Sequence, residues 1–193
     1  MADLIPHGLA VHLIGRASTE LAQALGISSV PLESADCAIF MVSAKDGIVR
    51  ADSDTWLLAR ELYIPSIVVI TDLTAENETD FEDMAAIASR ILDPVVTPYL
   101  VLHRDDATPI ALIDLISQQI IDYSTGQIEI RDSDLEHQEV IAEFREEYAE
   151  VLLAAGDDAF ENALLYPALP WIEGSRLGLA EIALYLNRVP LTR

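Results

Sequence analysis

The stretch AIFMVSAKDGIVRADSDTWLLARELYIPSIVVI (Ala38–Ile70) decides the fold. It opens with the apolar run Ala38–Val42 and closes with the mostly β-branched run Ile67–Ile70, and both runs are typical of strands buried in a parallel sheet. Between them, a turn at Asp46 precedes Asp54–Leu62, where apolar residues recur at helical spacing. A strand, a helix and a strand in this order predict a right-handed parallel crossover.

The same alternation extends to both sides of this unit, so we expect an α/β domain with helices covering a mainly parallel sheet. After Thr108 the pattern changes to a hairpin followed by a long acidic helix, which predicts a small α+β insertion. No linker separates two domains, and we expect one domain over residues 1–193. The remaining predicted strands are Val11–Gly15, Pro98–Leu102 as the third strand of the parallel layer, the hairpin Ile110–Tyr123 with Ile128–Ile130, and Leu164–Leu169; the remaining helices are Ser18–Leu25, Phe81–Leu92, Leu135–Ala155 and Leu177–Leu186.

Composition restricts the class of protein. The 193 residues are 51% hydrophobic, which suits a globular chain with a sizeable core, and the longest apolar runs have strand length. The N-terminus carries no evident secretory signal, and the single cysteine, Cys37, cannot form an internal disulfide. These features lead us to expect a soluble cytoplasmic protein in which Cys37 acts as a small buried apolar residue.

Charge excludes two kinds of partner. Thirty-three acidic residues against eleven basic ones give a formal net charge of −22, and this charge repels phosphate backbones and anionic membrane surfaces. We therefore expect neither nucleic-acid binding through a basic patch nor membrane binding. A protein partner is expected, and a homo-oligomer stays open.

A longer stretch, ADCAIFMVSAKDGIVRADSDTWLLARELYIPSIVVITDL (Ala35–Leu73), resembles the centre of the G domain of elongation factor G. The alanine-aspartate before the strand, the AxDG turn, the LLAREL helix and the P-x-IVV strand match in order and spacing. LIDLISQQIIDYSTG and FREEYAEVLLAAGDDAF resemble the subdomain inserted in these factors, and YPALPWIEGSRLGLAEIALYLNRVP resembles their closing strand and last helix. The resemblance covers roughly residues 35–190. It implies a sheet of P-loop-GTPase type in which residues 105–160 correspond to the inserted subdomain.

The phosphate-binding elements of that family are missing. A P-loop needs GxxxxGK[ST], because its glycines let backbone N–H groups wrap the phosphates and its lysine reaches the β/γ oxygens. The matching segment Gly15–Glu20 has neither the second glycine nor a lysine, and the only lysine of the chain is Lys45, in the AxDG turn. Ile27–Ser34 is too short for the first switch, the further strand and the magnesium-holding turn. We therefore expect no GTP hydrolysis.

The base-reading loop is altered as well. The family's [NT]KxD pattern reads guanine with its aspartate, but here Asp72 replaces the lysine and Thr74 replaces the aspartate. A threonine hydroxyl cannot make the paired contact of a carboxylate, and Trp171-Ile172-Glu173 replaces the supporting loop. We expect no catalytic residue, metal ligand or cofactor. The degenerate remnants of the nucleotide site are Gly15, Arg16, Ser18, Thr19, Thr71, Asp72 and Thr74.

Two other groups of polar residues are candidate sites. His103 and Asp105 follow a predicted strand and could join Asp72 in acid/base chemistry at the carboxyl edge of the sheet, although a local ion pair on a loop is the more ordinary interpretation. Asp132–His137 lacks the frame of a calcium loop and predicts a helix N-terminus capped by Ser133 or Asp134. The aromatic residues Trp56, Trp171, Phe144 and Tyr148 are expected in the core.

Three functions follow from these patterns. The leading hypothesis is a degenerate pseudo-GTPase, similar to elongation factor G, that acts as a non-hydrolytic protein-binding or regulatory module. The alternative is a GTP-binding or GTPase protein linked to translation whose missing elements come from a partner chain. The second alternative is a small enzyme that uses the carboxyl edge of the sheet.

Overall fold

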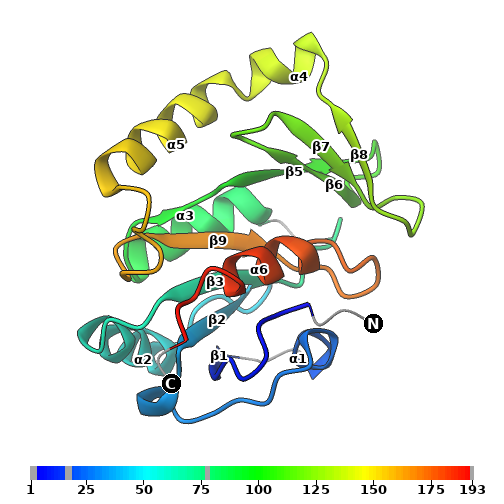
Figure 1. Ribbon diagram of the computed structural model, residues 1–193. Helices are drawn as coiled ribbons and strands as arrows, with labels where there is room; N and C mark the ends of the chain where they lie inside the picture. The colour runs from blue at the N-terminus through cyan, green and yellow to red at the C-terminus, as the bar shows by residue number, and fades with distance from the viewer. Residues whose placement is uncertain (1–3, 16–18, 77–78, 192–193) are drawn as a thin grey trace.

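The computed structural model describes residues 4–15, 19–76 and 79–191 (Figure 1). Within these residues the first sheet contains five parallel strands in the order β1-β2-β3-β9-β4, and the second contains four antiparallel strands in the order β5-β6-β7-β8. The mixed α/β class and the parallel sheet predicted from the sequence are confirmed. The strands are β1 (Val11–Gly15), β2 (Cys37–Ser43), β3 (Ser66–Thr71), β4 (Val95–Val96), β5 (Tyr99–His103), β6 (Pro109–Asp114), β7 (Gln119–Asp122), β8 (Glu129–Asp132) and β9 (Tyr166–Pro170).

The strands β2 and β3 form the centre of the parallel sheet, and every residue of both is buried. Burial on both faces explains why their sequences are continuously apolar instead of alternating. Helix α2 connects them and places Trp56 and Ala59 in the core, at helical spacing. The helices are α1 (Thr19–Leu25), α2 (Arg50–Glu61), α3 (Phe81–Ile91), α4 (Leu135–Val140), α5 (Ala142–Ala155) and α6 (Leu179–Leu186), with a short 3₁₀ helix at Leu32–Ser34.

The strands β5–β8 and the helices α4 and α5 form an antiparallel unit, inserted in the chain between β4 and β9. Figure 1 shows α6 in front of the parallel strands and below the antiparallel sheet. The helices α4 and α5 lie on the side of the antiparallel sheet that faces away from α6. Tyr99 and Val101 of β5 join the core that includes α6, whereas Leu100 joins a second core with Ile141 and Tyr148. The strand β5 is therefore buried on both faces, whereas every residue of the edge strand β8 is exposed.

Three predictions about this unit were wrong. The strand expected at Pro98–Leu102 pairs with β6 in the antiparallel sheet, whereas in the parallel sheet β9 pairs with β3 and β4 pairs with β9. The helix expected over Leu135–Ala155 divides at Ile141, whose buried side chain separates α4 from α5. Phe144 is 43% exposed and lies outside the core, although Trp56, Trp171 and Tyr148 are buried as expected.

The edge of the parallel sheet at β1 is closed by the short connection to β2. The N–H of Val30 donates to the carbonyl of Val11 at 3.0 Å, and the N–H of Leu13 donates to Ser29 Oγ at 3.0 Å. Residues 26–36 are all described, and they contain a 3₁₀ helix and an isolated bridge but no strand. A short segment thus caps the exposed backbone of β1 without adding a strand to the sheet.

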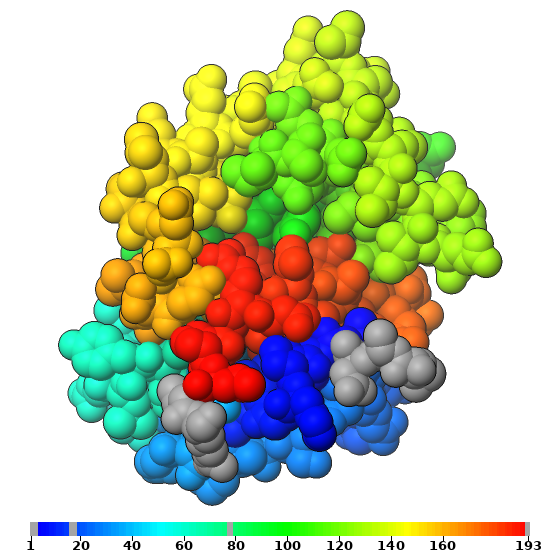
Figure 2. Space-filling view, viewed as in Figure 1, coloured from blue at the N-terminus to red at the C-terminus, as the bar shows by residue number. Residues whose placement is uncertain are grey.

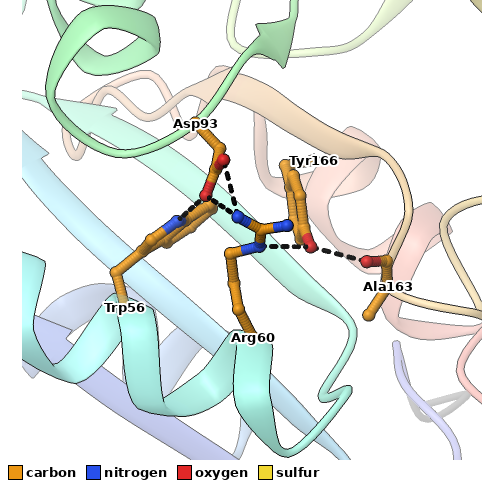
Figure 3. A network of polar contacts seen from close by, with 5 residues as sticks. All are labelled: Trp56, Arg60, Asp93, Ala163 and Tyr166. Atoms are coloured by element: carbon orange, nitrogen blue, oxygen red, sulfur yellow. Dashed lines mark hydrogen bonds and ion pairs between the residues drawn. The ribbon is translucent and has the colours of Figure 1, made fainter.

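A polar network joins α2, the end of α3 and β9 (Figure 3). Asp93 accepts a hydrogen bond from Trp56 Nε1 at 2.7 Å and two from Arg60 Nη1 at 2.7 and 2.8 Å. Arg60 Nε donates to the hydroxyl of Tyr166 at 3.2 Å, and that hydroxyl donates to the carbonyl of Ala163. The network therefore fixes two helices against the strand that joins the inserted unit to the parallel sheet.

Candidate functional site

The carboxyl ends of β1, β2, β3 and β9 meet at one edge of the parallel sheet, because parallel strands all run in one direction. The loops at this edge surround a cleft of about 680 Å³, the carboxyl-edge cleft. Its lining comes from α1 and from the loops after β2, β3 and β9: Thr19, Glu20, Lys45, Asp46, Thr71, Asp72, Leu73, Thr74, Trp171, Ile172, Glu173 and Gly174.

The loop after β2 is a tight turn that satisfies its own backbone. Ser43 Oγ accepts hydrogen bonds from the N–H of Lys45 at 3.2 Å and from the N–H of Asp46 at 3.0 Å, and the N–H of Gly47 donates to the carbonyl of Ser43 at 2.8 Å. These three N–H groups already have acceptors within the turn. A ligand oxygen would have to displace Ser43 to reach them.

The loop after β3 is similarly held by internal bonds. Thr71 is buried, its hydroxyl donates to Asp72 Oδ2 at 3.2 Å, and its carbonyl accepts from the N–H of Ala44 at 2.9 Å. Asp72 has a positive φ of 58°, a conformation that aspartate tolerates better than most residues. The start of this loop is therefore held to the loop after β2 through the carbonyl of Thr71.

The electrostatics of the cleft oppose anions. Among the described residues, four carboxyl groups line the cleft against the single ammonium of Lys45. The pKa of Glu173 is raised from its ordinary value, first by a side-chain hydrogen bond with Glu20, then by desolvation and by the charges of Glu20 and Asp72. Two carboxyl groups that share a hydrogen bond are most stable when one of them holds the proton. Phosphate oxygens entering this cleft would meet repulsion from the same groups. The four acidic residues are Glu20, Asp46, Asp72 and Glu173.

The structure brings most of the predicted remnants together. Thr19, Thr71, Asp72 and Thr74 all line the carboxyl-edge cleft. Gly15 ends β1 with a φ of 88°, and a Cβ at this position would lie 2.3 Å from the carbonyl oxygen of Met41. Position 15 therefore requires glycine, because β2 approaches too closely to leave room for a side chain. The other two predicted remnants, Arg16 and Ser18, lie outside the described residues.

The acid/base candidates are divided between two hollows. Asp72 lines the carboxyl-edge cleft, whereas His103 and Asp105 line a neighbouring hollow of about 360 Å³, and Leu73 and Thr74 border both. His103 is the last residue of β5, which belongs to the antiparallel sheet, whereas the sequence suggested that it follows a strand of the parallel sheet. The arrangement nevertheless brings the turn after β5 next to the loop after β3.

The other candidate groups have structural roles. Cys37 is fully buried in β2, and this burial raises the pKa of its thiol far above the ordinary range. Asp134 caps α4 by accepting a hydrogen bond from the N–H of His137 at 2.9 Å, as one of the two expected caps. Among the described residues, no group of three or more His, Cys, Asp or Glu side chains is arranged to hold a metal ion.

Sequence reasoning overlooked two features that the fold creates. Asp46 and Gly174 line the cleft, although nothing in the local pattern distinguished them from ordinary turn residues. Glu181 is buried within α6 and accepts hydrogen bonds from Tyr123 of the antiparallel unit. An acidic residue in the otherwise apolar run LGLAEIALYL was the available signal for this pair.

Together, fold and cleft define a parallel α/β domain with an inserted antiparallel unit and an acidic cleft at the carboxyl edge of its sheet. The chain is similar to the elongation factor G-like protein of two Mycobacterium tuberculosis strains, CDC 1551 / Oshkosh and ATCC 25618 / H37Rv. It is 27% identical to each over 158 residues, which are 82% of this chain and 21% of the relative. The predicted resemblance to elongation-factor-G-like proteins is thereby confirmed. The chain spans about a fifth of the length of these curated relatives.

A solved structure supports the same fold. The crystal structure of a protein from Thermus thermophilus superimposes with a TM-score of 0.68 at 24% sequence identity, over 82% of this chain and 27% of that chain. No family model matches the chain. In the described part of the chain, every helix is too short or too polar to cross a membrane.

Proposed function

We propose that this domain is a degenerate relative of the elongation factor G nucleotide-binding domain, of P-loop-GTPase type, and that it serves as a non-hydrolytic protein-binding or regulatory module. The observation that supports the proposal is the carboxyl-edge cleft, which is lined by Thr19, Thr71, Asp72 and Thr74, the residues that the resemblance matches to a nucleotide site, but has an acidic lining. Its turn after β2 has no spare donors among the N–H groups of Lys45, Asp46 and Gly47. A phosphate site needs the opposite arrangement, with free N–H groups and positive charge.

The rest of the fold agrees with this proposal. We infer that the connection that caps β1 stands in place of the longer segment that, in the family the sequence resembles, carries the first switch and the magnesium-holding turn. We infer that the antiparallel unit corresponds to the inserted subdomain expected at residues 105–160. A domain that keeps the parallel core and the inserted unit but lacks the motifs for nucleotide hydrolysis is suited to presenting surfaces to another protein, and its charge of −22 favours a partner with basic residues.

Calorimetric titration with GDP and GTP, with and without magnesium, tests the first half of the proposal. We expect no binding tighter than a Kd of about 10 µM, which corresponds to about 7 kcal/mol. A Glu20→Gln/Glu173→Gln double variant removes two of the four carboxyl groups of the cleft and should still bind weakly, because Asp46 and Asp72 remain and the N–H groups of the turn after β2 stay occupied. Tight binding by the unmodified chain would refute the pseudo-GTPase role and favour a nucleotide-binding protein completed by a partner.

Site-specific photocrosslinking in cells tests the second half. A benzophenone side chain at Glu173, on the cleft, should capture a discrete protein. The same group at Leu153, which is 88% exposed on α5, serves as the control for random capture. Equal yields and identical products at both positions would argue against a partner at the cleft.

The enzyme hypothesis is a second candidate, because the structure has two adjoining polar hollows beside Thr74. In an acid/base reaction at this place, Asp72 would act from the carboxyl-edge cleft, and His103 and Asp105 would act from the neighbouring hollow. Activity toward simple phosphate and carboxylate esters that is lost in both Asp72→Asn and His103→Gln would support it. Activity unchanged in both variants would exclude these residues.

A further inference from the structure

The helix α6 lies between the two sheets and is buried on nearly all sides. Six of its eight residues are buried, and one of them is acidic. Glu181 is only 4% exposed, and both of its carboxyl oxygens accept hydrogen bonds from the hydroxyl of Tyr123, at 2.9 and 2.7 Å. Figure 2 shows this helix (red) in the middle of the viewed face, between the antiparallel unit (green to yellow) and the N-terminal segment (blue). The pair therefore connects the two halves of the molecule at their centre.

Tyr123 is fixed within the antiparallel unit, so its bond to Glu181 fixes the unit as a whole. It follows β7 directly, is 5% exposed, and its N–H donates to the carbonyl of Ile110 in β6 at 2.9 Å. The unit also has a core of its own, formed by residues from β5, β6, β7, α5 and the turns between them. It can thus separate from α6 while its own packing stays intact.

The groups around Glu181 oppose its ionisation. Burial raises its pKa most strongly, the hydrogen bonds from Tyr123 and from its own backbone N–H lower it, and the nearby carboxylate of Asp114 raises it. Asp114 accepts hydrogen bonds from the N–H groups of Ile116 and Ser117 at 2.7 and 2.9 Å. The other titratable or charged groups facing this region from the packed elements are Tyr99 of β5, Tyr148 of α5, Tyr185 of α6 and Arg188 just beyond α6.

We propose that Glu181 and Tyr123 form a protonation-dependent latch, which holds the antiparallel unit against α6 while Glu181 is neutral and weakens that contact once Glu181 ionises. A neutral carboxyl group can be buried at low cost beside a tyrosine hydroxyl, but a carboxylate with one hydroxyl donor is under-solvated. Opening the latch lets water reach the carboxylate. It also exposes Tyr99, Val101 and Leu112, which pack into the core around α6.

The direction of the pH effect follows from the raised pKa. Because the docked state holds the proton more tightly than the open state, the latch contributes its full stability below the ordinary pKa of 4.5. This contribution is lost as the pH rises through the pKa of the docked state. Between these two values, opening should become about tenfold more frequent for each unit of pH.

Two measurements on the full chain test the latch. Carboxyl-carbon NMR follows the titration of Glu181, and native-state hydrogen exchange, corrected for intrinsic rates, follows the opening of β5–β7 from about pH 5 to about pH 8. We expect a raised midpoint for Glu181 and, over the same pH range, increasing exchange in the antiparallel sheet. Amides of β2 and β3 should not show this increase.

Variants distinguish the latch from a purely structural contact. Glu181→Gln should reduce the pH dependence of opening to the part contributed by Glu82 of α3, whose carboxyl group has a pKa raised by burial and accepts a hydrogen bond from the N–H of Val101 in β5 at 3.0 Å. Glu143→Gln, on the exposed side of α5, should leave the pH dependence unchanged. Tyr123→Phe removes the one hydroxyl donor and should move the Glu181 midpoint to higher pH, and it provides the test if Glu181→Gln fails to fold. An ordinary Glu181 midpoint, an equal pH slope in Glu181→Gln, or an unmoved midpoint in Tyr123→Phe would overturn the proposal.

Discussion

Replacing Asp93 by alanine tests whether the network of Figure 3 holds α2 and α3 to β9. Asp93 is the acceptor for Trp56 Nε1 at 2.7 Å, and Trp56 is only 1% exposed. Removing the carboxylate leaves this buried indole N–H without its acceptor, which costs about 1–3 kcal/mol. The lost ion pair with Arg60, whose side chain is 44% exposed, adds at most about 1 kcal/mol. We therefore expect Asp93→Ala to lower the free energy of unfolding by about 2–3 kcal/mol.

Urea unfolding monitored by tryptophan fluorescence measures this change, because Trp56 reports its own environment. Asp93→Asn keeps an oxygen acceptor for the indole and should lose only about half as much stability. The control is Asp54→Ala, which removes an exposed ion pair with Arg50 at 4.0 Å and should change stability by less than about 0.5 kcal/mol. If Asp93→Ala and Asp54→Ala had the same effect, the network would not stabilise the fold and the reasoning would be refuted.

Two further predictions concern local packing. Gly178→Ala should destabilise the chain by more than about 3 kcal/mol or prevent folding, because the added Cβ would lie 1.7 Å from the carbonyl oxygen of Pro170 at a φ of 92°. Gly126→Ala, at a φ of 78° with open space around it, should lose only about 1 kcal/mol in thermal unfolding, so equal losses would contradict the steric argument. Cys37 should not react with a thiol reagent such as Ellman's reagent in the native state and should react on unfolding, since it is fully buried and its pKa is raised; rapid native-state reaction would show that β2 is accessible.

The strand β5 was predicted in the parallel sheet but lies in the antiparallel one. It shows why a sequence pattern identifies a strand more readily than the sheet to which the strand belongs. Tyr99 and Val101 face the core around α6, while Leu100 faces the core beside α5. Burial on both faces removes the alternation that normally marks an antiparallel strand, so the run reads like a parallel one. Its partner, β6, is selected by the short turn that follows His103 and by the packing of α6. Neither feature leaves a periodic signal in the sequence.

The long helix predicted over Leu135–Ala155 failed for a related reason. Its apolar stripe is continuous through Val140, Ile141 and Phe144, so periodicity alone gives no sign of a break. In the structure Ile141 is 2% exposed and turns into the antiparallel core, while Val140 and Phe144 remain exposed. The free energy gained by burying the Ile141 side chain decided where the helix divides. This gain is available only because the antiparallel sheet provides an apolar site for the side chain.

The sequence by itself determined the parallel α/β core and the absence of the phosphate-binding motifs, because both depend on residue types at fixed local spacing. The buried runs of β2 and β3, the turn at Gly47 and the lone Lys45 carry that information within a few residues. Only the tertiary structure decided that Glu20, Asp72 and Glu173 would gather in one cleft, and that Tyr123 would meet Glu181. These residues are far apart in the chain, and their proximity follows from the common direction of the strands and from the seating of α6 between two sheets.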